Sequence, residues 1–88
     1  MIKMKKVVIY TGPRCNYCSA AKHLLSKKKV VYTEFDIVLD QSKLQEMQRR
    51  TKGARTIPQI FIGETYVGGY NELKALEIAG KLNSLLEI

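Results

Sequence analysis

The chain has 88 residues, 45% of them hydrophobic and 26% charged, and its formal net charge is +7. This length accommodates one small core, so we expect a single domain over residues 1–88. The composition excludes a disordered chain, and no apolar run approaches the roughly 20 residues that a membrane-spanning helix needs. The first apolar run, residues 7–10, is too short for the core of a signal peptide, and a cytoplasmic, reducing location is therefore expected.

The first half of the chain predicts a strand, a helix and a second strand. Residues 7–10 are uniformly apolar, which is typical of a strand buried on both faces. After a turn containing Gly12 and Pro13, apolar residues recur every three or four positions over 16–28 and predict an amphipathic helix. Residues 30–37 are rich in β-branched and aromatic side chains and predict a strand that a right-handed crossover places parallel to the first.

The second half predicts a helix, a hairpin and a closing helix. Asp40 to Ser42 open the helix, Ser42 with Gln45 matches a capping box, and Gly53 ends it. Residues 59–62 and 65–67 predict two strands joined by a tight turn. Asn71 is a candidate N-cap for a third helix that stops at Gly80, and residues 82–86 predict a final short turn.

The two cysteines, Cys15 and Cys18, are the only ones in the chain, and they stand where a strand and a turn lead into a helix. Unpaired N–H groups and the helix dipole at that position favour the thiolate of Cys15. A zinc site usually needs four ligands, and the one histidine, His23, is turned roughly 140° away from Cys18 on the helix. A permanent disulfide would close only a short loop and stabilise little. A redox-active dithiol is therefore the favoured interpretation.

The positive charge is spread along the chain. Lys27 to Lys29 close the first predicted helix, where cations suit the negative end of the dipole. Arg49, Arg50, Lys52 and Arg55 precede the third predicted strand. No basic stripe interleaved with aromatic residues is present, so the pattern favours a small anionic ligand over nucleic acid.

Three motifs, in order and spacing, resemble those of the dithiol glutaredoxins. They are Cys-Asn-Tyr-Cys at 15–18, Thr-Ile-Pro-Gln-Ile-Phe-Ile-Gly at 56–63, and Gly-Gly-Tyr-Asn-Glu-Leu at 68–73. The resemblance implies a thioredoxin fold of the α/β class, with a four-stranded mixed sheet in the order 2-1-3-4 and helices on both faces. Strands one and two would be parallel, strand three antiparallel to strand one, and strand four antiparallel to strand three.

The resemblance also implies a glutathione site beside the dithiol. Pro58 would be preceded by a cis bond, and the backbone of Ile57 would pair with the extended ligand. The γ-glutamyl end would dock at Asn71 and Glu72, although a capping role for Asn71 is an equal alternative. Gln45 is either a contact for the glycine carboxylate or only the capping-box partner of Ser42. The residues assigned to glutathione binding are Arg14, Tyr17, Gln45, Thr56, Ile57, Pro58, Gly69, Asn71 and Glu72.

Three positions depart from the family pattern. Asn16 replaces a proline between the cysteines, Gly12 replaces a lysine three residues before Cys15, and Asn71 replaces the first residue of an acidic pair. Arg14 is the nearest substitute for the missing cation. The change at Asn16 would shift the redox potential in a direction that the sequence does not define.

The resemblance implies a glutathione-dependent thiol-disulfide oxidoreductase that reduces protein disulfides and protein–glutathione mixed disulfides. Cys15 would be the nucleophile and Cys18 the resolving thiol. We expect a monomer that uses glutathione as cosubstrate, holds no tightly bound cofactor, and acts on disulfide-containing or glutathionylated proteins but not on nucleic acid or membranes. Two alternatives stay open: a [2Fe–2S] protein with Cys15 as cluster ligand, and a thioredoxin-like electron donor reduced by a flavoenzyme.

Overall fold

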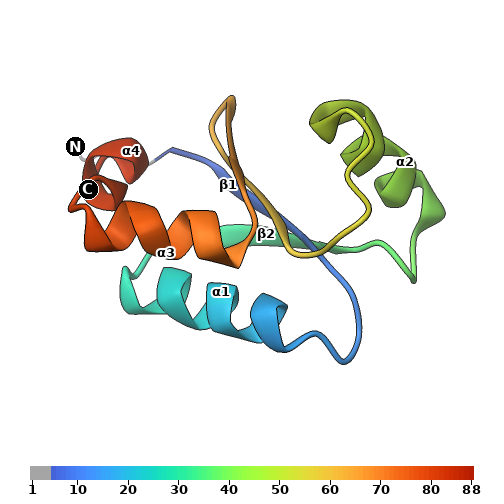
Figure 1. The fold of residues 1–88 in the computed structure, drawn as a ribbon, viewed down its shortest axis with the longest axis horizontal. Coiled ribbons are helices and arrows are strands. Elements are labelled where there is room, and N and C mark those ends of the chain that lie inside the picture. The colour runs from blue at the N-terminus through green and yellow to red at the C-terminus, as the bar shows by residue number, and fades with distance from the viewer. Residues whose placement is uncertain (1–4) are drawn as a thin grey trace.

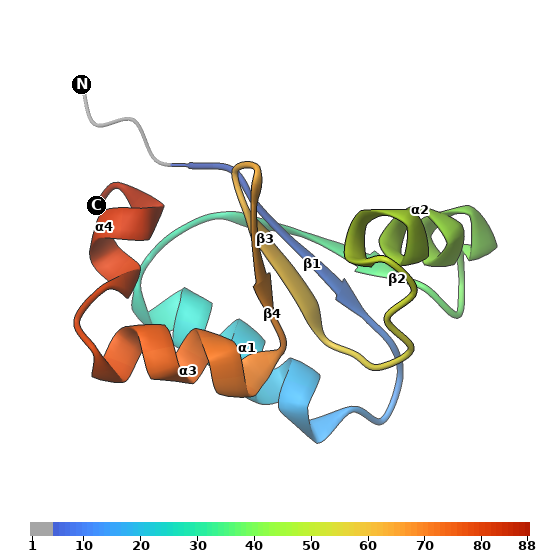
Figure 2. The same cartoon turned by 45° about the horizontal axis from the view of Figure 1, so that its top comes forward.

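Four strands form one mixed sheet in the computed structural model. The structure describes residues 5–88, and residues 1–4 lie outside the described part. The strands are β1 (Val7–Thr11), β2 (Tyr32–Asp36), β3 (Gln59–Ile62) and β4 (Thr65–Gly68). Their order is β2-β1-β3-β4. β1 is parallel to β2 and antiparallel to β3, and β4 is antiparallel to β3 (Figures 1 and 2). The predicted strand order and directions are confirmed.

Helices cover both faces of this sheet, as expected of a thioredoxin fold. They are α1 (Asn16–Lys27), α2 (Gln41–Thr51), α3 (Tyr70–Ile78) and α4 (Leu82–Leu86). α1 and α3 lie side by side on one face, and α2 lies across the other (Figures 1 and 2). Because side chains alternate along a strand, β1 serves both layers. Val7 and Ile9 pack with the core under α1, α3 and α4, whereas Val8 and Tyr10 pack with Met47 of α2.

The second strand is shorter than predicted. β2 begins at Tyr32 instead of residue 30, because its partner β1 begins at Val7, which pairs with Tyr32. Val30 is still buried in the core, but Val31 is 82% exposed before the strand starts. The apolar pair therefore belongs to the connection from α1, whose last turn is followed by Lys29 with a φ of 59°.

Two predicted helix caps are wrong. The N-cap of α2 is Asp40, whose Oδ1 accepts hydrogen bonds from the Ser42 N–H at 3.0 Å and the Ser42 hydroxyl at 2.6 Å. The hydroxyl of Ser42 is thus a donor to Asp40 and does not form the predicted capping box with Gln45. The N-cap of α3 is Gly69, and Asn71 lies inside the first turn of that helix. In both cases the N-cap lies two residues earlier than predicted. The Asp40 carboxylate caps α2, and α3 follows its N-cap Gly69, whose own N–H donates to the Glu72 carboxylate.

Candidate active site

The dithiol lies at the N-terminus of α1, as the sequence predicts. Cys15 is the N-cap residue, and its Sγ accepts a hydrogen bond from the N–H of Cys18 at 3.1 Å. The two sulfur atoms are bonded to each other. Cys18 is 2% exposed on the buried side of the helix, whereas Cys15 is half-buried. An attacking partner can therefore reach Cys15 and not Cys18.

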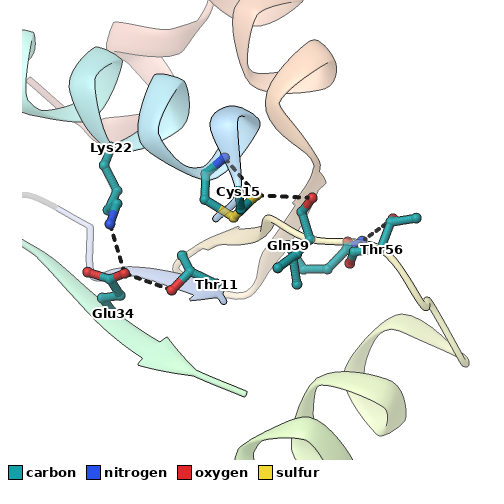
Figure 3. Close-up of a disulfide and its surroundings, with 8 residues drawn as sticks. Thr11, Cys15, Lys22, Glu34, Thr56 and Gln59 are labelled. Atoms are coloured by element: carbon teal, nitrogen blue, oxygen red, sulfur yellow. Dashed lines mark hydrogen bonds and ion pairs between the residues drawn. A yellow bond between two sulfur atoms is a disulfide. The ribbon is translucent and has the colours of Figure 1, made fainter. Parts of the chain in front are cut away.

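The segment before β3 brings a backbone carbonyl beside the dithiol. The bond between Ile57 and Pro58 is cis, which confirms the prediction from the resemblance. The carbonyl oxygen of Ile57 lies 3.8 Å from Cys15 Sγ (Figure 3). Residues 42 positions apart in the chain thus meet, and the main chain of Ile57 borders the Cys15 sulfur.

A groove of about 290 Å³ runs along this segment to the start of α3. Seven of the nine residues expected to bind glutathione line it. They are Tyr17, Thr56, Ile57, Pro58, Gly69, Asn71 and Glu72. Because Ile57 lines the groove and its carbonyl oxygen lies 3.8 Å from Cys15 Sγ, the groove lies beside the dithiol.

The sequence reasoning missed one lining residue, Tyr70. Its ring stacks with that of Tyr17 at a centroid distance of 6.1 Å and forms an aromatic wall between α1 and α3. Tyr17 is 61% exposed, so this wall faces the solvent side of the groove. The available signal was position: Tyr70 directly follows Gly69 in a motif already assigned to the ligand.

The carboxylate of Glu72 has a structural partner within the protein. Its Oε1 accepts a hydrogen bond from the N–H of Gly69 at 2.7 Å and closes the start of α3. A Cβ at Gly68 would lie 2.9 Å from this oxygen, so the side chain lies flat against the glycine pair. Glu72 therefore shapes the end of the groove, in addition to any contact with a ligand.

Two expected ligand residues lie outside the groove lining. Gln45 is exposed on α2, and its alternative role as a capping-box partner is wrong. Arg14 is exposed in the turn before α1, with a φ of 53°. Both remain predicted contacts for parts of a ligand that extend beyond the groove.

A charged cluster lies behind the dithiol (Figure 3). The Glu34 carboxylate accepts hydrogen bonds from the Thr11 hydroxyl at 2.7 Å and from Lys22 Nζ at 3.0 Å. The Thr11 bond is the main cause of a lowered pKa for Glu34, and Lys22 adds to it. This cluster ties the end of β1 to β2 and α1, and so supports the turn that carries Cys15. His23 is exposed, as predicted, and no group of three or more potential metal ligands occurs within residues 5–88.

Comparison with known proteins agrees with this geometry. The sequence profile of the glutaredoxin family matches residues 7–67. A glutaredoxin of Pseudomonas aeruginosa is 50% identical over 84 residues, covering 94% of this chain and 98% of the relative. The chain belongs to the glutaredoxin family.

Solved glutaredoxins share the fold. The solution structure of the Brucella melitensis glutaredoxin is 48% identical, with a TM-score of 0.82 and coverage of 96% of this chain and 90% of that one. A buckwheat glutaredoxin–glutathione complex is 27% identical, with a TM-score of 0.81 and coverage of 91% and 74%. This glutaredoxin is a thiol-disulfide oxidoreductase with Cys15 and Cys18 as its dithiol. None of the helices within residues 5–88 is long and apolar enough to span a membrane.

Gly12 lies close to the side chain of Ile57. A Cβ at Gly12 would lie 2.8 Å from Ile57 Cδ1 and 3.6 Å from Val38 Cγ2. The end of the Ile57 side chain therefore occupies the space into which a side chain at position 12 would project. The residue at position 12 is therefore linked to the position of the Ile57 side chain, and Ile57 lines the groove.

Proposed function

We propose that this glutaredoxin uses glutathione to reduce protein–glutathione mixed disulfides and protein disulfides. The observation that carries the proposal is the groove lined by Ile57, whose carbonyl oxygen lies 3.8 Å from Cys15 Sγ. The tripeptide would lie extended along the groove, with its main chain paired to the backbone N–H and C=O of Ile57. The similar buckwheat protein in complex with glutathione supports this choice of ligand.

Each end of glutathione has a chemically suitable neighbour. The N–H of Gly69 donates to Glu72, but the N–H groups of the first turn of α3 that follow it have no partner inside the helix and suit the γ-glutamyl carboxylate. Arg14 and Gln45 are the proposed contacts for the glycine carboxylate on the opposite side. The Tyr17 ring would flank the ligand between these two ends.

The reaction begins with the Cys15 thiolate. This thiolate attacks the glutathione sulfur of a mixed disulfide, forms a Cys15–glutathione disulfide and releases the protein thiolate. The thiolate of a second glutathione attacks that disulfide, which yields glutathione disulfide and restores the Cys15 thiolate. The N–H of Cys18, which already donates to Cys15 Sγ, stabilises the negative charge at the start and the end of this cycle.

Protein disulfides need the second thiol. Attack by Cys15 gives a Cys15–protein disulfide, and the Cys18 thiolate displaces the protein thiolate and forms the Cys15–Cys18 disulfide. Two glutathione molecules then reduce this bond through a Cys15–glutathione intermediate. Because Cys18 is buried one turn along α1, it meets the Cys15 adduct and not external disulfides. We expect a monomer working in the reducing cytoplasm.

Glutathione-coupled reduction of a small mixed disulfide tests the proposal. Cys18→Ser should retain turnover of small glutathione mixed disulfides and lose most activity on protein disulfides, whereas Cys15→Ser should lose both. Ser19→Ala, at an exposed neighbouring position, is the matched control and should behave as wild type. Reduction by a flavoenzyme without any turnover in glutathione would favour the thioredoxin-like alternative. A brown, iron-containing protein after anaerobic purification would instead favour the [2Fe–2S] alternative.

A further inference from the structure

The buried side-chain amide of Gln59 is hydrogen-bonded to Thr56, the first residue of the segment 56–58 that lines the groove. Gln59, the first residue of β3, is 4% exposed and does not line the groove. Its Nε2 donates to the Thr56 carbonyl at 2.8 Å and to the Thr56 hydroxyl at 3.1 Å (Figure 3). These two bonds link residues three apart and close a ring around Ile57 and Pro58, the residues that border Cys15.

The other end of the same amide is held by the hairpin. The Tyr66 hydroxyl donates to Gln59 Oε1. The Tyr66 ring is stacked on Phe61 with centroids 4.9 Å apart, so the hydroxyl projects from a fixed ring. Burial, followed by the negative charge of Glu72, raises the pKa of Tyr66 and keeps this hydroxyl protonated as a donor.

The hydrogen bonds leave the Gln59 amide a single orientation. A tyrosine hydroxyl donated to Oε1 forces Nε2 to face Thr56, where both of its hydrogens have acceptors. A buried amide without such partners would be costly, so the arrangement is well defined. Tyr66, Gln59 and Thr56 therefore form a chain from the edge of the sheet to the groove.

We infer that Gln59 and Tyr66 are positioning residues that set the affinity for glutathione by holding Thr56 and Ile57 in place. Neither side chain lies in the groove, so both act through the backbone that pairs with the ligand. The inference rests on the proposed glutathione-dependent function. Thr56 and Tyr66 are both exposed, so water can replace their bonds to Gln59 without unfolding the protein. When the bonds to Gln59 are removed, residues 56–58 therefore lose their fixed geometry, but the protein stays folded.

Steady-state kinetics with a small glutathione mixed disulfide test the inference. Tyr66→Phe removes only the hydroxyl and keeps the ring on Phe61, and Gln59→Met keeps the side-chain volume without the amide. Each should raise KM roughly two- to tenfold, the range expected for one or two net hydrogen bonds. The kcat and the rate of Cys15 alkylation should stay within about twofold, because the bond from the Cys18 N–H is untouched. Tyr32→Phe is the matched control, since the Tyr32 hydroxyl makes no hydrogen bond within residues 5–88, and its KM should not change.

The double variant decides whether Tyr66 acts through Gln59. If it does, Tyr66→Phe adds nothing to KM once Gln59→Met is present, because the two belong to one chain of contacts. Unchanged KM in both single variants, additive effects in the double variant, or equal losses in the Tyr32→Phe control would each overturn the inference. A wild-type protein without glutathione-dependent turnover would instead overturn the proposed function. These failures are distinguishable because the inference concerns ratios to an active wild type.

Discussion

The two faces of the sheet are packed against their helices by different kinds of contact. The face under α1, α3 and α4 is a dry aliphatic cluster with Ile9, Leu25 and Leu73 at its centre, all fully buried. On the opposite face α2 contributes one fully buried side chain, Met47, and its other contacts with the sheet are mainly aromatic and charged. Apolar burial involves no titratable group and is not weakened by charge screening, whereas the charged contacts of α2 are sensitive to both pH and screening by salt.

The contacts of α2 centre on Tyr10, which is fully buried in β1. Its hydroxyl donates to the Glu46 carboxylate at 2.5 Å and accepts a hydrogen bond from Arg50 at 2.9 Å. The Arg50 guanidinium also lies 3.8 Å from the centre of the Phe61 ring. Lys43 also contacts both an aromatic ring and an acidic side chain. Its Nζ lies 4.0 Å from the centre of the Phe35 ring and 3.3 Å from Glu46 Oε1. α2 is therefore the element that we expect to detach most easily.

Deleting apolar volume from the aliphatic face should have the largest effect. Leu25→Ala should lower the free energy of unfolding by about 2–5 kcal/mol, because it leaves a cavity in a fully buried cluster. Chemical denaturation measures this loss, and amide exchange should accelerate in all four strands together. Ser26→Ala, at the next and exposed position of α1, should stay within about 0.5 kcal/mol of wild type. A loss confined to α1 would show that this face is not the global core.

Removing the Arg50 guanidinium from the α2 face of the sheet should have a smaller and more local effect on stability. Arg50→Ala removes both the hydrogen bond to Tyr10 and the contact with Phe61, and should cost about 1–3 kcal/mol. Hydrogen exchange should show the loss mainly in α2. Arg49→Ala is the matched control, since Arg49 is exposed and makes no ion pair or hydrogen bond within residues 5–88. Equal destabilisation by the two alanine variants would mean that general helix propensity, and not the Tyr10 network, holds α2.

Protonation of Glu46 at low pH should lower the free energy of unfolding by the smallest amount of the three changes. The hydrogen bond from Tyr10 is the main cause of a lowered pKa for Glu46, and Lys43 adds to it. Because the folded pKa lies below the unfolded one, the stabilisation is complete above the unfolded value of 4.5 and is lost as pH falls through the folded value. The difference in unfolding free energy between wild type and Glu46→Gln should be under about 1 kcal/mol at neutral pH and vanish in acid. The comparison with Glu46→Gln is needed because the pKa of Glu34 is also lowered, so protonation of Glu34 lowers the stability of both proteins in acid. A pH-independent difference would exclude this mechanism.

What the sequence could predict was local or carried by motifs. The unbroken apolar run of β1, the helical spacing of α1 and the cysteine pair are all properties of neighbouring residues. The strand order and the cis bond before Pro58 came from the resemblance. The helix caps were wrong because two acceptors competed within three residues, and only the folded backbone shows that Asp40 and Glu72 take the N–H groups.

The remaining features depend on contacts between distant or irregularly paired residues. Tyr10 and Arg50 are 40 positions apart, so nothing in either segment predicts their hydrogen bond. Tyr66 and Gln59 lie on adjacent strands, but the β3–β4 register shifts between Ile60 and Phe61. A regular hairpin register deduced from the tight turn would not reveal which side chains meet across that shift.

The close approach of Gly12 to Ile57 makes the effects of substitutions at the two positions depend on each other. The crowding atom is Cδ1 of Ile57, which valine lacks. A side chain at position 12 would have to push this methyl group aside, a shift that Ile57→Val makes unnecessary. Glutathione KM values for the two single variants and the double variant would reveal this dependence as a penalty on Gly12→Lys that Ile57→Val removes. The residue at one position thus sets how much room a side chain has at the other.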